Sequence, residues 1–261
     1  MILVSTFLND SPVFGPVKSR RLGVSLGVNL MPATGKICTF DCLYCENGLN
    51  AQRRTRVGYN DAQTVLNSLE ARLRQMAAEG ELPDVITFAG NGEPTASPAF
   101  PEAIRGAVRL RDELAPAAKI AVLSNGTRAA VPEVHDALML VDDNILKLDT
   151  VDADYIALLD RPTGPYDVEG QIGAFASFGG HAIVQTIFLT GSVDGTSVDN
   201  TGEKYVGPWL EALRRIGPEA VTIYTVARET PVSGLAKAAP DVLDAIADRV
   251  RALGIRCTVS Y

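Results

Sequence analysis

Three cysteines near the start of the chain have the spacing of metal ligands. Cys38, Cys42 and Cys45 fall within eight residues, whereas the fourth cysteine, Cys257, lies more than two hundred positions away. Two disulfides in a secreted chain would not crowd the cysteines in this way. Three thiolates can hold three irons of a [4Fe–4S] cubane and leave the fourth iron open, whereas an electron-transfer cluster takes four cysteines. The spacing therefore predicts a cluster with one open iron.

Two other interpretations of the cysteines remain open. A zinc knuckle closes at four ligands, so it would need a fourth ligand from Cys257, His135 or His181. The other alternative is a group of reduced thiols that bind no metal. Both alternatives predict a binding module or a structural loop rather than redox chemistry.

A glycine-rich motif follows an apolar segment expected to form a strand. Its residues are Gly90, Asn91, Gly92, Glu93 and Pro94. Glycines let a backbone approach a ligand closely, and a carboxylate accepts hydrogen bonds from an ammonium group. The alternative is an ordinary turn between a strand and a helix.

Polar residues also stand at or near the ends of later apolar segments. Ser124 and Asn125 end one such segment, and Ser-Asn-Gly is equally a turn sequence. Lys147 and Asp149 are two positions apart, so they lie on one face of the next strand. There they either enter the interior of a barrel or form a buried salt bridge. Gln185 is a lone amide on a strand, suited to a ligand or to a hydrogen-bonded place in the core.

With these motifs in this order, the sequence resembles the radical SAM superfamily, which has an aromatic residue before the third cysteine, here Tyr44. The resemblance implies a [4Fe–4S] cluster on the three cysteines and S-adenosylmethionine (SAM) as cofactor. It also implies a flavodoxin- or ferredoxin-type electron donor and hydrogen abstraction from a substrate. The residues expected to bind SAM are Tyr44, Gly90, Asn91, Gly92, Glu93, Ser124, Asn125 and Gln185.

Two further stretches, residues 14–23 and 224–231, resemble a branch similar to wyosine-type tRNA base-synthesising proteins. This resemblance implies a tRNA substrate, although the chain has neither a flavodoxin-like segment nor cysteines for a second cluster. The alternatives are radical modification of a small anionic metabolite or peptide, and a noncatalytic iron–sulfur or zinc module. The catalytic candidates are Lys147, Asp149 and Arg228, and the substrate-binding candidates are Arg20, Arg21, Arg228 and Glu229.

The elements that must position these residues alternate along the chain. Helical periodicity predicts helices near residues 60–79, 98–114, 132–140, 152–159, 166–178, 204–216 and 241–253. Apolar runs predict strands near residues 21–30, 84–89, 119–123, 144–148, 182–189, 220–226 and 256–259. Residues 190–202 read as a long loop. About six strand–helix units predict an α/β fold, a partial (β/α)6 barrel with a mostly parallel sheet.

Composition predicts one globular domain over residues 1–261, in which residues 1–30 form an extension with the first strand and residues 31–50 form the cluster loop. With 46% hydrophobic and 21% charged residues, the 261-residue chain can bury a full core. No apolar run approaches the length of a membrane span, so a cytoplasmic protein is expected. The net charge of −7 disfavours nonspecific binding along nucleic acid, but the segment through Arg56 carries +4 and the remainder −11.

Overall fold

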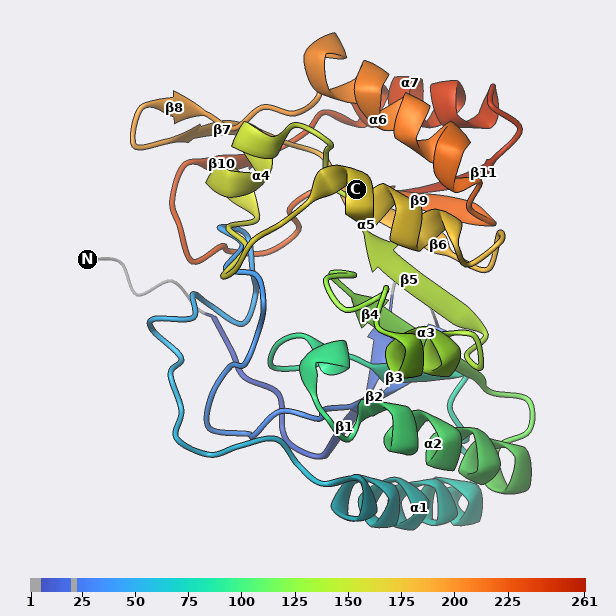
Figure 1. The fold of residues 1–261 in the computed structure, drawn as a ribbon. Helices are drawn as coiled ribbons and strands as arrows, with labels where there is room; N and C mark the ends of the chain where they lie inside the picture. The colour runs from blue at the N-terminus through green and yellow to red at the C-terminus, as the bar shows by residue number, and fades with distance from the viewer. Residues whose placement is uncertain (1–5, 20–22) are drawn as a thin grey trace. The chain divides into compact units, whose positions relative to one another are not determined.

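The computed structural model describes residues 6–19 and 23–261, and Figure 1 shows their ribbon. The chain divides into two compact units. Unit A comprises Leu8–Cys38 and Arg53–Ile145, and unit B comprises Met1–Phe7, Thr39–Gln52 and Leu146–Tyr261. The expectation that residues 1–261 form a single domain stays a prediction.

Unit A contains strands in the order β1-β2-β3-β4. Strand β2 (Gly23–Val28) pairs in parallel with β3 (Val85–Phe88), which pairs in parallel with β4 (Lys119–Ser124). Strand β1 (Val13–Ser19) pairs antiparallel with β2. The sequence did not predict β1, because Gly15 and Pro16 interrupt its apolar pattern.

The helices of unit A are α1 (Ala62–Glu79), α2 (Phe100–Leu114) and α3 (Pro132–Leu138), with a short 3-10 turn, η1 (Pro94–Ala96), before α2. Helix α1 starts where the Asp61 carboxylate accepts a hydrogen bond from the Thr64 amide at 2.8 Å. The apolar face of α1, formed by Val65, Leu69, Leu73 and Met76, is buried, and Gly80 ends the helix in the left-handed conformation. Helices α1 and α2 lie side by side (Figure 1).

Unit B contains a parallel group of strands in the order β6-β9-β11. These are β6 (Ile183–Ile187), β9 (Ala220–Tyr224) and β11 (Arg256–Ser260). Its helices are α4 (Ala153–Leu159), α5 (Val168–Ala176), α6 (Glu203–Ile216) and α7 (Pro240–Arg251). The buried Trp209 of α6 donates to the Leu148 carbonyl and the Thr186 hydroxyl, both at 3.1 Å. Strand β5 (Asp143–Lys147) begins in unit A and ends in unit B.

Unit B also holds a small antiparallel sheet of β7 (Leu189–Val193), β8 (Thr196–Ser197) and β10 (Leu235–Lys237). The expectation of a long loop at residues 190–202 is therefore wrong for its first half. Strands β7 and β8 form a hairpin whose turn contains Asp194 and Gly195, both with positive φ. The third strand of this sheet is β10, about forty residues later in the chain, and no local sequence pattern predicts its pairing with β7.

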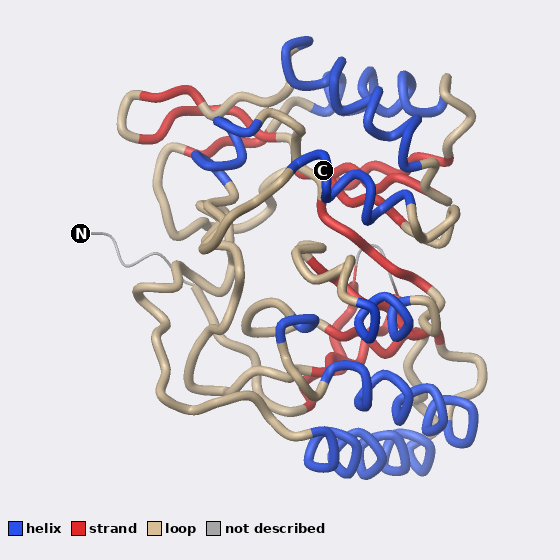
Figure 2. Tube along the Cα trace, in the orientation of Figure 1, coloured by secondary structure: helices blue, strands red, loops and turns tan. Residues whose placement is uncertain are grey.

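The α/β class and the mostly parallel sheet are confirmed, and each predicted helix overlaps an observed one. Figure 2 shows a long path without helix or strand between β2 and α1, and the predicted cluster loop at residues 31–50 lies on it. In the two described stretches of the chain, no helix combines the length and the apolar character that crossing a membrane requires.

Candidate functional site

The glycine-rich motif holds the segment that carries Cys38. Ile37 and Gly92 form an isolated parallel bridge, in which the Ile37 amide donates to the Asn91 carbonyl and the Glu93 amide donates to the Ile37 carbonyl, both at 3.0 Å. Gly92 has a φ of 140°, and a Cβ there would lie 1.8 Å from the Ile37 carbonyl oxygen. Only glycine fits this contact. The sequence motif and the first cysteine, far apart in the chain, are thus joined within unit A.

Glu93 directly follows Gly92 and is 2% exposed. Its Oε1 accepts from the Thr95 amide (3.0 Å), the Thr95 hydroxyl (2.6 Å) and the Ser124 hydroxyl (2.7 Å), and its Oε2 accepts from the Asn125 amide (2.7 Å). Burial raises the pKa of Glu93, although these hydrogen bonds oppose the shift. The carboxylate therefore joins the end of β3 to the end of β4.

Asn125 extends this group to the cysteine. Its side-chain Nδ2 lies 3.8 Å from Cys38 Sγ, within reach of a weak hydrogen bond to sulfur. Its Oδ1 accepts from the Thr127 amide at 3.1 Å. The structure therefore brings Cys38, Glu93, Ser124 and Asn125 together beside the ends of β3 and β4.

Asn91 and Gly90 face another part of unit A. The Asn91 side chain accepts from the Asn9 amide at 2.7 Å and donates to the carbonyls of Asn9 and Pro32, each at 3.0 Å. A Cβ at Gly90 would lie 2.5 Å from the Asn29 side-chain oxygen. Both residues are therefore used in packing the loops around the motif.

Cys42 and Cys45 lie in unit B, where a turn joins them through a hydrogen bond from the Cys45 amide to the Cys42 carbonyl at 3.2 Å. The Gly48 amide donates to the Cys45 carbonyl at 2.9 Å and continues the turn. Cys38 belongs to unit A. All four cysteines are thiols rather than disulfides.

Tyr44, between these two cysteines, points into a buried polar group that includes Lys147, Asp149 and Asp160. The Tyr44 hydroxyl donates to Asp149 Oδ2 and lies 2.9 Å from Asp160 Oδ1. The Lys147 ammonium donates to the Tyr44 oxygen and to Asp149 Oδ2, the latter at 3.1 Å. Asp149 Oδ1 accepts from the Ile187 amide at 3.0 Å, which ties the group to the carboxyl end of β6.

The electrostatics of this group follow from its burial. The Asp149 side chain is fully buried and that of Lys147 is 17% exposed. Burial favours a neutral Lys147, but the surrounding negative groups, Asp149 first, together outweigh burial and raise the pKa of Lys147 well above its usual range. Burial first, and then the charge of Asp149, raise the pKa of Asp160 well above its usual range.

The expectation that Lys147 and Asp149 share a face and enter an interior is consistent with this geometry, and so is the alternative of a buried salt bridge. Sequence reasoning missed Asp160. Its only local signal is a position at the end of helix α4 before Arg161 and Pro162, and nothing there indicates a partner more than one hundred residues earlier.

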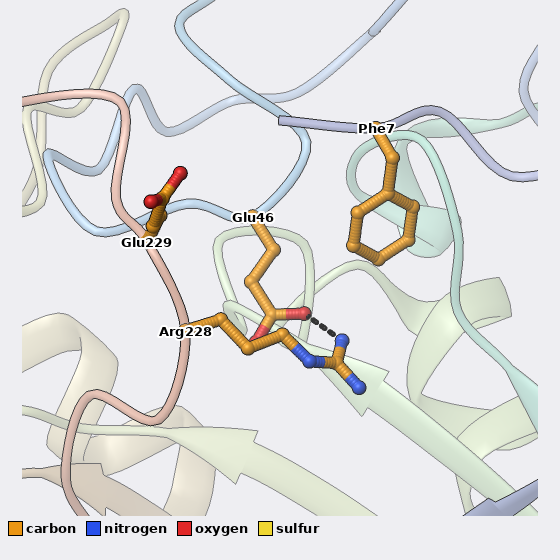
Figure 3. A pocket seen from close by; sticks show the side chains of 4 residues that line it. All are labelled: Phe7, Glu46, Arg228 and Glu229. Carbon is orange, nitrogen blue, oxygen red and sulfur yellow. Dashed lines mark hydrogen bonds and ion pairs between the residues drawn. The ribbon is translucent and has the colours of Figure 1, made fainter. Parts of the chain in front are cut away.

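The remaining candidates of unit B lie elsewhere. Gln185, in the middle of β6, is half-buried and pairs in register with Thr222 of β9. Arg228 and Glu229 line a pocket of about 360 Å³ together with Phe7 and Glu46 (Figure 3). Arg228 forms an ion pair with Glu46, and its guanidinium carbon lies 5.7 Å from the centre of the Phe7 ring. The candidates Arg20 and Arg21 lie outside the described residues.

The alternative of a zinc site receives little support from Cys257. This residue pairs with Val221 near the start of β9, whereas the Tyr44 group contacts the carboxyl end of β6. Burial raises the pKa of the Cys257 thiol to about 11, which disfavours the thiolate that a metal needs.

Among residues 6–19 and 23–261, no group of three or more His, Cys, Asp or Glu side chains is placed to hold a metal ion. The fit to a [4Fe–4S] cluster therefore rests on donor chemistry. Three reduced cysteines in a short loop would supply the soft thiolate ligands that such a cluster takes, and one iron would be left without a protein ligand. By their donor chemistry, these residues fit the cluster.

Solved structures with a similar fold are radical SAM enzymes. A radical SAM methyltransferase from Sphaerobacter thermophilus has a TM-score of 0.66 at 19% identity, with 91% of this chain and 66% of that chain covered. SuiB from Streptococcus suis, bound to S-adenosylmethionine, has a TM-score of 0.64 at 13% identity, with 90% of this chain and 50% of that chain covered. The chain therefore has the fold of radical SAM enzymes.

Comparison with curated sequences supplies the family, whereas no family model matches the chain. A GTPase Obg from Brachyspira hyodysenteriae is 28% identical over 85% of this chain, which spans only 31% of that protein. A UPF0026 protein from Helicobacter pylori is 34% identical over 59% of this chain and 47% of its own length. The resemblance to wyosine-type proteins stays a prediction. A UPF0026 protein from Synechocystis sp. is 30% identical over 84% of this chain and 77% of its own length, so the chain belongs to the UPF0026 protein family.

Proposed function

We propose that this protein is a radical SAM enzyme that binds a [4Fe–4S] cluster through Cys38, Cys42 and Cys45. The observation that carries the proposal is the cysteine loop on a radical SAM fold, with the residue before Cys38 paired to the glycine of the Gly-Glu motif. When bound, the cluster would supply the electron that cleaves SAM and yields a 5′-deoxyadenosyl radical for hydrogen abstraction.

The other residues have roles that follow from their places. Gly90 and Gly92 let the motif approach its neighbours, and Glu93, Ser124 and Asn125 shape the site beside Cys38. Gln185 and Tyr44 are proposed to complete the binding of SAM. A flavodoxin- or ferredoxin-type protein is the proposed electron donor.

The substrate is proposed to be a structured RNA, as the resemblance to wyosine-type proteins implies. A basic segment that includes Arg20, Arg21, Arg53, Arg54 and Arg56 supports it, since local positive charge attracts phosphates. Modification of a tRNA base is the corresponding reaction.

A second candidate substrate is a small anionic metabolite or a peptide, which the pocket around Arg228 favours. Glu46 pairs with Arg228, and Glu229 also lines the pocket. Its volume of about 360 Å³ is in the range of pockets that hold small ligands. Glu46 directly follows Cys45, so this pocket adjoins the cysteine turn in the chain.

The test begins with anaerobic reconstitution of the full chain with iron and sulfide. We expect about four irons per chain, a spectrum that changes on addition of SAM, and release of 5′-deoxyadenosine after reduction. Incubation with total tRNA or with a peptide and metabolite mixture, each deuterated, then identifies which source transfers deuterium to 5′-deoxyadenosine. A chain that binds zinc in place of iron, or that releases no 5′-deoxyadenosine, would refute the proposed function.

A further inference from the structure

A short segment of unit B runs beside the cysteine loop and holds it. This segment, Leu159–Thr163, is named the strap. Its backbone contacts with the loop are four hydrogen bonds, Leu43 N to Leu159 O (2.9 Å), Asp41 N to Asp160 O (3.0 Å), Asp41 N to Arg161 O (3.1 Å) and Thr163 N to Thr39 O (2.9 Å), and an antiparallel bridge between Phe40 and Pro162. Ladder contacts of this kind fix the path of residues 39–43, immediately before Tyr44.

The strap has an unusual backbone at Arg161, whose φ is 51°. A residue other than glycine rarely adopts this left-handed conformation, which costs on the order of 1 kcal/mol. Here it lets the carbonyls of Asp160 and Arg161 both accept from the Asp41 amide, at 3.0 and 3.1 Å. The left-handed conformation of Arg161 therefore strengthens the hydrogen bonding between the strap and the loop.

The side chain of Asp160 reaches the loop from the same strap. The Tyr44 hydroxyl contacts two carboxyl groups, Asp149 and Asp160, and Asp160 Oδ1 accepts from it at 2.9 Å. Lys147 donates to the Tyr44 oxygen. Asp160 therefore gives Tyr44 a buried hydrogen-bond partner on the same strap that holds residues 39–43.

We propose that Asp160 is a positioning residue which, as a hydrogen-bond partner of Tyr44 on the strap, holds Tyr44 and so sets the orientation of Cys42 and Cys45. The proposal rests on the proposed function, because it assigns these cysteines to the cluster. Asp160 acts through Tyr44, which stands between these two cysteines in the chain.

The test compares Asp160→Asn with Asp160→Ala. An asparagine side chain keeps an acceptor oxygen and nearly the same shape, whereas alanine leaves the Tyr44 hydroxyl without this partner. In the full chain before reconstitution, hydrogen exchange of peptides covering residues 39–45 should quicken about two- to tenfold in Asp160→Ala, the range expected for one lost hydrogen bond. Asp160→Asn should match the wild type.

Matched variants separate a local from a general effect. Tyr44→Phe removes only the hydroxyl and should quicken the same peptides, and it carries the measurement if Asp160→Ala fails to fold. Asp152→Ala removes the carboxylate that accepts from the Tyr155 amide at the other end of helix α4, and it should leave the loop unchanged. Unchanged exchange in Asp160→Ala and Tyr44→Phe, or equal acceleration in Asp160→Asn and Asp160→Ala, would overturn the proposal.

A spectroscopic readout ties the loop to the cluster. After reconstitution, the electron paramagnetic resonance spectrum of the reduced cluster should broaden or shift in Asp160→Ala and stay at the wild-type position in Asp160→Asn. An identical spectrum in Asp160→Ala would count against the positioning role. Failure of the wild type itself to take up iron would refute the proposed function, while the exchange measurement would still decide whether Asp160 holds the loop.

Discussion

Glu93 shows how one carboxylate can have a structural role beside a proposed binding role. Its two oxygens accept four hydrogen bonds from Thr95, Ser124 and Asn125 within unit A. Replacing it by glutamine would turn an amide donor toward groups that are themselves donors. A buried conflict of this kind costs about 1–3 kcal/mol.

We therefore expect Glu93→Gln to lower the free energy of unfolding of the cluster-free chain by about this amount and to weaken SAM binding after reconstitution. Urea unfolding measures the first effect and equilibrium binding the second. Glu81→Gln, at an exposed position after α1, serves as the control and should change neither quantity. Weakened SAM binding without loss of stability would assign Glu93 to the ligand alone, and loss of stability with unchanged binding would assign it to the turn.

The cysteines give a second prediction at this scale. Replacing any one of Cys38, Cys42 and Cys45 by alanine should abolish the cluster, because all three thiolates are needed to hold three irons while the fourth stays open for SAM. Cys257→Ala should keep full iron content, since its buried thiol has a pKa of about 11 and resists ionisation. Iron quantitation and the spectrum of the reduced protein with and without SAM provide the measurement. Loss of iron in Cys257→Ala would show that the fourth site is closed.

A third prediction concerns pH. Asp160 is faced by Asp149, which with burial raises its pKa, and by Lys147 and Tyr44, which oppose the shift; Tyr155 and Tyr166 are the other ionisable groups nearby. The native state thus keeps a proton that the unfolded chain releases above about pH 4. The contribution of Asp160 to the free energy of unfolding is therefore lost as the pH rises from about 4 toward the pKa of Asp160 in the folded state.

Asp160→Asn removes this titration, so the variant should gain stability relative to the wild type between pH 5 and pH 8. Urea unfolding at the two pH values measures the difference. Asp152→Asn, which keeps a helix-capping side chain at the start of α4, should follow the wild type. A constant difference between Asp160→Asn and wild type across this range would show that Asp160 is ionised in the native state.

At the scale of elements, the bridge between Ile37 and Gly92 is where the cysteine loop meets the end of β3. Gly92→Ala would place a Cβ 1.8 Å from the Ile37 carbonyl oxygen at a φ of 140°. We expect this change to break the bridge and to lower the free energy of unfolding by more than about 2 kcal/mol. We also expect it to reduce iron uptake.

The matched control is Gly58→Ala in the same long loop, where an added Cβ meets nothing within 4 Å. This change should be neutral or slightly stabilising, by up to about 1 kcal/mol, because it restricts the unfolded chain. Denaturation and iron content of the two variants give the comparison. Equal behaviour of Gly92→Ala and Gly58→Ala would mean that the bridge does not hold the loop.

At the scale of the whole molecule, the uneven charge distribution bears on the partner. The net charge is −7, but the segment through Arg56 carries +4. If the substrate is RNA, log affinity for total tRNA should fall linearly with log salt concentration. Replacing Arg20 and Arg21 together by alanine should reduce that slope by up to about two, since each lost phosphate contact counts for about one, and should spare SAM cleavage without substrate.

The control pair is Arg214→Ala with Arg215→Ala on helix α6, which changes the net charge equally. These arginines already form ion pairs with Glu211 and Glu169. We expect the paired Arg214→Ala and Arg215→Ala substitutions to leave the salt dependence of the tRNA affinity unchanged. An equal effect of the two pairs would indicate general electrostatics, and absence of tRNA binding at low salt would remove the RNA hypothesis in favour of the small-substrate alternative.

The sequence by itself determined the features that depend on near neighbours in the chain. Helices such as α1 follow from the 3.6-residue period of Val65, Leu69, Leu73 and Met76, and the cluster prediction follows from three cysteines within eight residues. The parallel sheet follows from alternation of strands and helices. These signals survive in a single sequence because they are local.

Only the tertiary structure decided which distant residues meet. Tyr44 contacts Asp160 across 116 positions, Asn91 contacts Asn9 across 82, and the sheet of β7 and β8 gains β10 from far along the chain. A polar side chain is buried only where another segment supplies its hydrogen-bond partner. The sequence names the donor and the acceptor but not their pairing, because that pairing depends on how non-adjacent elements pack.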